Sequence, residues 1–239
     1  RYAPSGALIA REPRYGISWH VMRSELDEGD LLATRSFDVA PGETSLTINT
    51  KCYEAAIESF GPLCDALASG SASPIPQDLR QKHYFGKWLR PAAAGLLDFT
   101  RPAPDLEALV RALDFGRYEN PLGTAKLQHR GRVVNVGRAQ AEATSAPAEP
   151  GTVIAIDADA LVVAAGGGHL RLGDFSEPRG RRVTVAELAS SLGIAAGTRL
   201  EGASCELAER LGAINAELCK GEEFFVRRLQ KERDRTVSK

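Results

Sequence analysis

The chain has 239 residues, of which 43% are hydrophobic and 26% are charged, so it can bury a core in one large or two small domains. Its 30 Lys and Arg residues against 31 Asp and Glu residues leave a net charge of -1, which excludes a general electrostatic attraction to nucleic acid or an anionic membrane. No apolar run approaches the roughly 18 residues of a membrane helix, and no segment has the composition of a signal peptide. We therefore expect a cytoplasmic protein without a membrane partner.

Residues 1–70 alternate between strand-like and helix-like patterns, which predicts an α/β unit. The run from Ile17 to Met22 predicts one strand. Gly29 interrupts a charged loop, and the run from Leu31 to Val39 then predicts a second strand.

A helix is expected over residues 46–68, where apolar side chains recur at helical spacing. Thr44 or Ser45 can cap its first turn, because a side-chain oxygen there accepts from an unpaired backbone N–H. We expect the pair Gly61–Pro62 to split the helix in two, since proline lacks the backbone donor and clashes with the preceding turn.

The amino-acid composition changes along residues 71–92, from small and proline-containing to basic and aromatic. The first part predicts a linker that closes the first unit. Residues 82–90 allow two interpretations. In the first, they form a basic and aromatic surface that contacts RNA or a carrier protein. In the second, they are a linker whose aromatic side chains pack against the first unit, since aromatic side chains gain most from burial.

Residues 93–201 predict a small β domain that opens with a helix from Leu106 to Leu113. Short apolar runs at roughly ten-residue spacing are typical of a small barrel of the oligonucleotide/oligosaccharide-binding (OB) type. The runs cover residues 133–136, 151–156, 160–165 and 169–172. Gly166–Gly168 is interpreted as a hairpin turn rather than a phosphate loop, because no Lys-Ser/Thr follows and no helix starts there.

The last part of the chain predicts helices. Thr184 and Glu187 have the spacing of a capping box, which predicts the start of a short helix. Residues 202–239 form an expected helical tail, with one amphipathic helix from Cys205 to Lys231. That helix is expected to pack on a partner or on a second copy.

The four cysteines are scattered, and no pair has the two-residue spacing of a zinc knuckle or a redox dithiol. This pattern predicts reduced thiols, as is usual in the cytosol. The positions are Cys52, Cys64, Cys205 and Cys219.

An acidic loop between the two predicted strands contains the best candidates for chemistry, namely Glu25, Asp27, Glu28 and Asp30. Carboxylates at strand ends of an α/β sheet lie where ligands usually bind. A charge run is also a common solvated surface loop, and the composition alone favours that alternative. The spacing lacks the ligand alternation of a calcium loop, so no metal site is predicted.

The segment from Gly16 to Leu32 resembles the strand–loop–strand segment of the 10-formyltetrahydrofolate-dependent formyltransferases. The resemblance implies a partial Rossmann-like domain, with Asp27 as the catalytic aspartate of a Leu-Asp-x-Gly-Asp run. It also implies that the preceding loop grips the pteridine of the cofactor, 10-formyltetrahydrofolate. That loop consists of Met22, Arg23, Ser24, Glu25 and Leu26.

The resemblance extends over most of residues 1–201. Residues 49–57 look especially like members linked to peptide synthetases, and residues 221–229 look like the lead-in to an adjoining assembly-line domain. Further segments match the C-terminal domain of the family. These are residues 94–99, 120–126 and 150–157.

The family's other two catalytic residues, an asparagine and a histidine, precede a Leu-Pro-Arg-Tyr segment whose end matches Arg1-Tyr2. We therefore expect both to lie before Arg1, in a longer parent protein, and this chain alone to be inactive. His20 is a candidate replacement base, although a histidine in a strand is more often packed or hydrogen-bonded.

Two classes of function follow. The first is an enzyme that moves a formyl group to an amine on a tRNA, on a carrier protein or on a small molecule, with a carboxylate that helps to move a proton. The second is a non-catalytic module, or a degenerate relic, that docks a substrate or carrier. The balanced charge favours a carrier-bound or small amine over tRNA.

Overall fold

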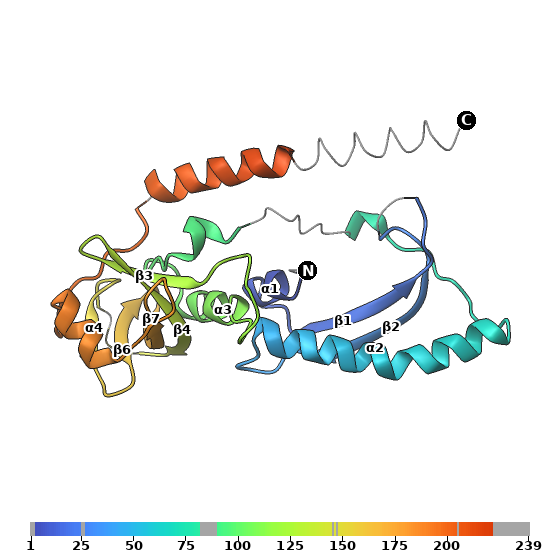
Figure 1. Ribbon diagram of the computed structural model, residues 1–239, viewed down its shortest axis with the longest axis horizontal. Coiled ribbons are helices and arrows are strands. Elements are labelled where there is room, and N and C mark those ends of the chain that lie inside the picture. The colour runs from blue at the N-terminus through green and yellow to red at the C-terminus, as the bar shows by residue number, and fades with distance from the viewer. Residues whose placement is uncertain are drawn as a thin grey trace.

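The computed structural model shows an elongated molecule with a compact β region at one end and a narrow arm at the other (Figure 1). The two parts meet at α1 and α3, near the N-terminus. The residues that the structure describes are 3–24, 27–81, 90–144, 146, 148–204 and 206–221.

The arm consists of α1 (Ala3–Ile9), the antiparallel strands β1 (Arg14–His20) and β2 (Leu31–Asp38), and a long helix that lies across the hairpin. The second strand is confirmed to within one residue. The predicted start of the first strand was wrong, because the ladder already begins where Arg14 pairs with Asp38. Cross-strand pairing, rather than the local apolar alternation, sets that boundary.

The long helix α2 runs from Ser45 to Ala68, and the predicted cap is confirmed. Thr44 accepts a hydrogen bond from the backbone N–H of Thr47, and the Thr47 side chain accepts from the Thr44 backbone in return. The predicted break at Pro62 was wrong, since the helix passes through it without interruption. Leu63 is buried directly after the proline, and this packing offsets the missing backbone hydrogen bond.

After α2 the chain returns along the arm and is hydrogen-bonded to the start of β2. The backbone groups of Ile75 and Leu31 exchange two hydrogen bonds of 2.7 and 2.8 Å. A short 3-10 helix follows at Leu79–Gln81. The basic and aromatic residues 82–89 lie outside the described residues, so both interpretations of that stretch stay predictions.

The β region is a six-stranded antiparallel sheet in the order β3-β4-β7-β6-β5, with β8 paired to β7. A 3-10 helix (Ala92–Gly95) and α3 (Ala103–Ala112) precede it, and α4 (Val185–Leu192) follows it. The strands are β3 (Ala125–His129), β4 (Arg132–Glu142), β5 (Val153–Ile156), β6 (Leu161–Ala165), β7 (Gly168–Ser176) and β8 (Arg182–Val183).

The core of this region joins one face of α3 to the sheet, and Leu106, Leu127 and Leu170 are fully buried in it. Each predicted run overlaps a strand, although residues 151, 152 and 160 lie before the strands that they were expected to start. The strands β4 and β7 extend well beyond the predicted runs, because polar side chains on the solvent side still belong to the ladder. The hairpin at Gly166–Gly168 is confirmed by the pairing of Ala165 with Gly168. The chain is thus a mixed α/β protein. The Rossmann-like and OB-like assignments stay predictions.

The capping box at Thr184 and Glu187 is confirmed, with α4 starting at Val185. Residues 206–221 are helical, as predicted for the tail, and the rest of the expected helix lies outside the described residues. None of the helices in the described ranges is both long enough and apolar enough to span a bilayer.

Candidate functional site

The acidic loop closes the far end of the β1–β2 hairpin. The backbone N–H of Val21 donates to the carbonyl of Asp30 over 3.0 Å, which brings the two ends of the loop together. Gly29 sits in this closure and is buried. A Cβ atom at Gly29 would lie 1.6 Å from the carbonyl oxygen of Val21, so only glycine fits the closed loop.

Asp27 lies in a turn at the exposed tip of this loop, in the left-handed backbone region with φ 59°. Its side chain is 82% exposed, and its Oδ1 lies 3.5 Å from Nε2 of His20. The Nδ1 atom of His20 lies 3.1 Å from the carbonyl oxygen of Val21. We assign Nδ1 as the donor in that contact, which leaves Nε2 of the neutral ring as an acceptor that faces the carboxylate. A proton that enters this gap would therefore find an acceptor on either side.

Two further contacts hold the loop in place. Arg23 pairs with Asp30 over 2.7 Å within the loop. From outside, the side-chain amide of Gln77 donates to the backbone carbonyl of Asp27 over 3.1 Å and to that of Gly29. Sequence reasoning missed Gln77, because only the return of the chain past Ile75 brings it to the loop.

The β1 strand that carries His20 is fixed on α2 one residue earlier. The indole N–H of Trp19 donates to Oγ of Ser59 over 2.8 Å, and the Trp19 and Phe60 rings lie 5.5 Å apart. An aromatic residue with its N–H satisfied is a firm anchor. The position of the His20 ring therefore depends on α2 as well as on the hairpin.

The residues predicted to grip the cofactor lie beside Asp27. Met22 is 90% exposed, and Arg23 and Ser24 are also exposed. The backbone groups of Met22 and Arg23 have no backbone partner in the described part of the chain. Such free N–H and C=O groups suit the donors and acceptors along a pteridine edge. Glu25 and Leu26 lie outside the described residues, and the roles of all these residues stay predictions.

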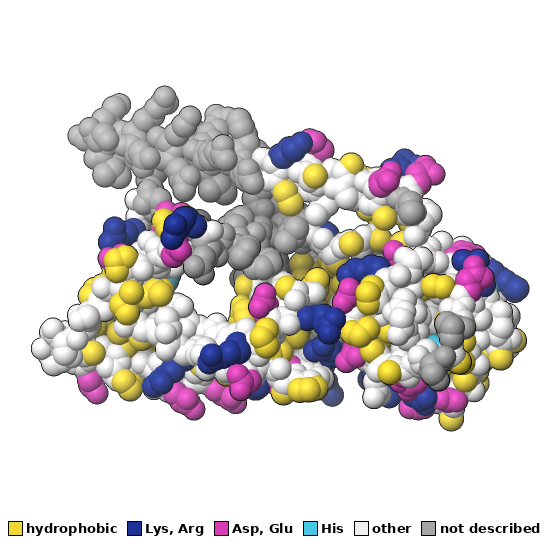
Figure 2. Space-filling view, turned by 180° about the vertical axis from the view of Figure 1, so that it is seen from behind, with side chains coloured by type: hydrophobic (Ala, Val, Ile, Leu, Met, Phe, Trp, Pro, Cys, Tyr) yellow, Lys and Arg dark blue, Asp and Glu magenta, His cyan; other side chains and the backbone are white. Residues whose placement is uncertain are grey.

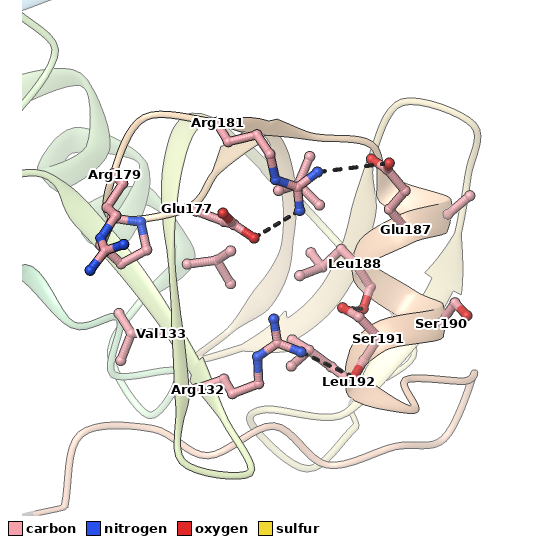
Figure 3. A pocket seen from close by; sticks show the side chains of 14 residues that line it. Arg132, Val133, Glu177, Arg179, Arg181, Glu187, Leu188, Ser190, Ser191 and Leu192 are labelled. Carbon is pink, nitrogen blue, oxygen red and sulfur yellow. Dashed lines mark hydrogen bonds and ion pairs between the residues drawn. The ribbon is translucent and has the colours of Figure 1, made fainter.

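A cavity of about 870 Å³ lies at the other end of the molecule, between β4, α4 and the turn before β8 (Figure 3). The guanidinium of Arg181 lies 2.7 Å from Glu177 and 3.9 Å from Glu187. The hydrogen bond from Arg181 lowers the pKa of Glu177, and hydrogen bonds from Thr184 lower that of Glu187. Arg181 thus pairs with both carboxylates of the cavity, while Arg132 and Arg179 leave the lining with a net positive charge. No cluster of His, Cys, Asp and Glu suited to a metal occurs within the described ranges.

Residues 91–193 match the family described as the formyl transferase, C-terminal domain. The chain is also 33% identical over 196 residues to a methionyl-tRNA formyltransferase of Paraburkholderia phymatum, covering 82% of this chain and 58% of that protein. It is 36% identical over 183 residues to the Myxococcus xanthus methionyl-tRNA formyltransferase, covering 75% of this chain and 54% of the relative. The chain thus spans a little over half the length of these curated relatives.

Solved structures share the fold. HypX from Aquifex aeolicus, solved with tetrahydrofolic acid, has a TM-score of 0.59 at 18% identity, over 80% of this chain and 33% of HypX. The N-formyltransferase of Helicobacter canadensis, solved with folinic acid and dTDP-3-aminofucose, has a TM-score of 0.58 at 11% identity, over 72% of this chain and 60% of that one. The solved structures show the fold, and the two curated relatives show the family. The chain belongs to the formyltransferase family.

Proposed function

We propose that this chain is the second part of an enzyme that transfers the formyl group of 10-formyltetrahydrofolate to an amine, with Asp27 as a catalytic residue. The observation that carries the proposal is the exposed Asp27 carboxylate beside Nε2 of His20, on a loop that Gly29 and Gln77 hold closed. The 33% identity to a methionyl-tRNA formyltransferase over 196 residues supports formyl transfer as the reaction class.

The proposed chemistry needs a proton acceptor at this position. The cofactor supplies the formyl carbon, which forms a bond to the acceptor nitrogen while its bond to the folate nitrogen breaks. The acceptor amine loses one proton, and the folate nitrogen gains one. Asp27 and His20 can hold that proton between them, and an exposed carboxylate can receive it directly from an incoming amine. The free backbone groups of Met22 and Arg23 would orient the pteridine.

A longer parent protein is part of the proposal. The chain spans 58% and 54% of the two curated relatives. In addition, one face of α2 exposes Ile57, Phe60 and Leu67 by 77, 53 and 51%. These residues follow helical spacing, and an apolar helical stripe of this kind is usually covered by another part of a protein. We propose that residues 1–70 complete a formyltransferase domain with a segment that precedes Arg1.

The acceptor is proposed as an amine on a carrier protein or a small molecule rather than on tRNA, because the net charge of -1 offers little attraction to RNA. The tail after residue 221 is proposed to lead into an adjoining assembly-line domain. In the second candidate function, a docking module, the chain would bind such a carrier without catalysis.

The test is formyl transfer by the parent protein and its Asp27→Asn variant, with Asp38→Asn as the matched control. Asp38 is an equally exposed carboxylate at the opposite end of the hairpin. Asp27→Asn should lower kcat by about 10²- to 10⁴-fold, the usual contribution of a positioned acid or base. The control should keep full activity. Full activity in the Asp27→Asn protein would rule out Asp27 as a catalytic residue, and a parent protein without any transfer would leave the docking module.

A further inference from the structure

A second pocket, of about 470 Å³, lies where the first half of α2 meets the loop after α3. Three of its nine lining residues are aromatic. Tyr53 projects from α2, while Phe115 and Tyr118 project from the loop. Asn49, one turn before Tyr53, and Glu119 add the polar groups. The volume is in the range of small-molecule sites.

The base of this pocket is rigid. Ser45 is buried and donates to the carbonyl of Ala112 over 2.7 Å, while it accepts from Ser5 over 2.8 Å. The backbone N–H of Leu46 donates to the carbonyl of Asp114. Helix α2 and the end of α3 are therefore joined directly below the aromatic walls, so the pocket keeps its shape without a ligand.

The loop that forms the second wall is also fixed at both ends. Gly116 packs so closely on Leu46 that an added Cβ would lie 2.6 Å from its Cδ2, and its φ of 62° also favours glycine. At the other end the side-chain amide of Asn120 donates to the carbonyls of Leu113 and Gly123 over 2.7 and 2.6 Å. Tyr118 and Glu119 are thus held in position between two anchors.

The pocket carries one charge, and that charge is negative. Glu119 is the only ionisable acid or base in the lining besides the two tyrosines. Within the described residues it makes no ion pair, and the polar ends of Asn49, Tyr53 and Tyr118 make no hydrogen bond. Tyr53 and Tyr118 are 66 and 74% exposed. A ligand can therefore reach all four groups without breaking an existing contact.

We propose that this pocket binds a small organic cation, an alkylammonium or a quaternary ammonium. The face of an aromatic ring attracts a cation through its quadrupole, and three such rings line the pocket with one free carboxylate. The methyl or methylene groups of an alkylammonium also gain from contact with the apolar walls. The Glu119 carboxylate would repel an anion, and it would give a neutral ligand no charge attraction.

This site is separate from the Asp27 loop. The loop end of the hairpin packs at Ser59 and Phe60, whereas the pocket uses the first turns of α2. Along α2, Ser59 lies about 15 Å from Asn49 and about 9 Å from Tyr53, the lining residue nearest to it. The bound ammonium is therefore not the reacting amine of formyl transfer, and the site does not depend on that activity.

The experiment is an NMR titration of the 239-residue chain with tetramethylammonium chloride, followed at the amides of Asn49, Tyr53, Tyr118 and Glu119. Sodium chloride and tert-butanol, a neutral molecule of similar shape, are titrated in parallel. Saturable shifts with a dissociation constant on the order of 1 mM are expected for the ammonium alone. Equal shifts with tert-butanol or with sodium chloride would overturn the proposal.

Variants test the individual groups. Glu119→Gln should weaken ammonium binding by about threefold to fivefold, and the double variant with Tyr118→Leu by about tenfold. Both positions are exposed, so the fold should persist. Glu54→Gln, an exposed residue beside Tyr53 but outside the lining, is the matched control and should bind like the unchanged chain. Unaltered binding in the double variant would overturn the assignment. So would tighter binding of a lysine-containing peptide than of the free ammonium, because the site would then belong to a protein partner.

Discussion

The β region and the arm differ in how much hydrophobic core each of them has. In the β region one continuous core includes Leu127 and Leu170, both fully buried. Among the described residues of the arm, the one buried apolar cluster joins Leu8 and Ile48, and Ala112 from α3 completes it. The core of the arm, which carries the candidate catalytic loop, therefore includes a residue of the β region.

The difference also appears at the surface. Hydrophobic side chains are exposed along the arm (Figure 2), and those of α2 include Ile57 and Phe60. The hairpin is two-stranded, and an isolated hairpin is only marginally stable in water. The stability of the candidate site should thus depend on packing outside the hairpin. The packing partners are α2, Ala112 of α3 and the segment proposed to precede Arg1.

The strongest test of this comparison is a pair of truncations. Leu127→Ala should lower the free energy of unfolding by about 2–5 kcal/mol, because it empties space in a packed core. Ile57→Ala, at a side chain that is 77% exposed, should change it by less than about 0.5 kcal/mol. Chemical denaturation of both variants measures the contrast. A large loss in Ile57→Ala would show that the stripe on α2 is already packed in this chain.

A smaller effect is expected at His129, which is 6% exposed at the end of β3. Neither ring nitrogen has a hydrogen-bond partner within the described residues. An unsatisfied buried polar group is destabilising, so His129→Leu should raise the free energy of unfolding by about 1 kcal/mol. Thermal unfolding at neutral pH measures the change. A loss of stability would mean that the ring nitrogens are satisfied in solution, for example by water.

Another effect is confined to alkaline pH and to the arm. Burial, with a lesser contribution from Cys52, raises the pKa of Tyr15 to about 12. An unfolded tyrosine ionises near pH 10, so between pH 10 and about 12 only the unfolded state loses the proton, and stability falls as the pH rises. Tyr15→Phe should lose less stability across this window. Chemical denaturation at several pH values measures the free energy of unfolding of both proteins. If this free energy fell equally with pH in both proteins, the burial of the Tyr15 phenol would be contradicted.

Local signals in the sequence predicted the elements well where neighbouring residues decide the structure. The cap at Thr44, the capping box at Thr184 and the turn at Gly167 each depend on groups within a few residues. The break at Pro62 was also a local prediction, but here burial of Leu63 and the contacts of Trp19 outweighed it. The start of β1 needed the partner strand.

The candidate site divides in the same way. The sequence by itself predicted the acidic loop, its interruption at Gly29 and the resemblance of the Asp27 segment to a family pattern, since all of these lie within one short segment. The tertiary structure alone brought Gln77 onto the loop, and the hairpin set His20 beside Asp27. It also placed Tyr53 opposite Tyr118 across a pocket. Contacts between residues far apart in the chain depend on how helices and strands pack, and that packing is a balance over the whole core that no local pattern records.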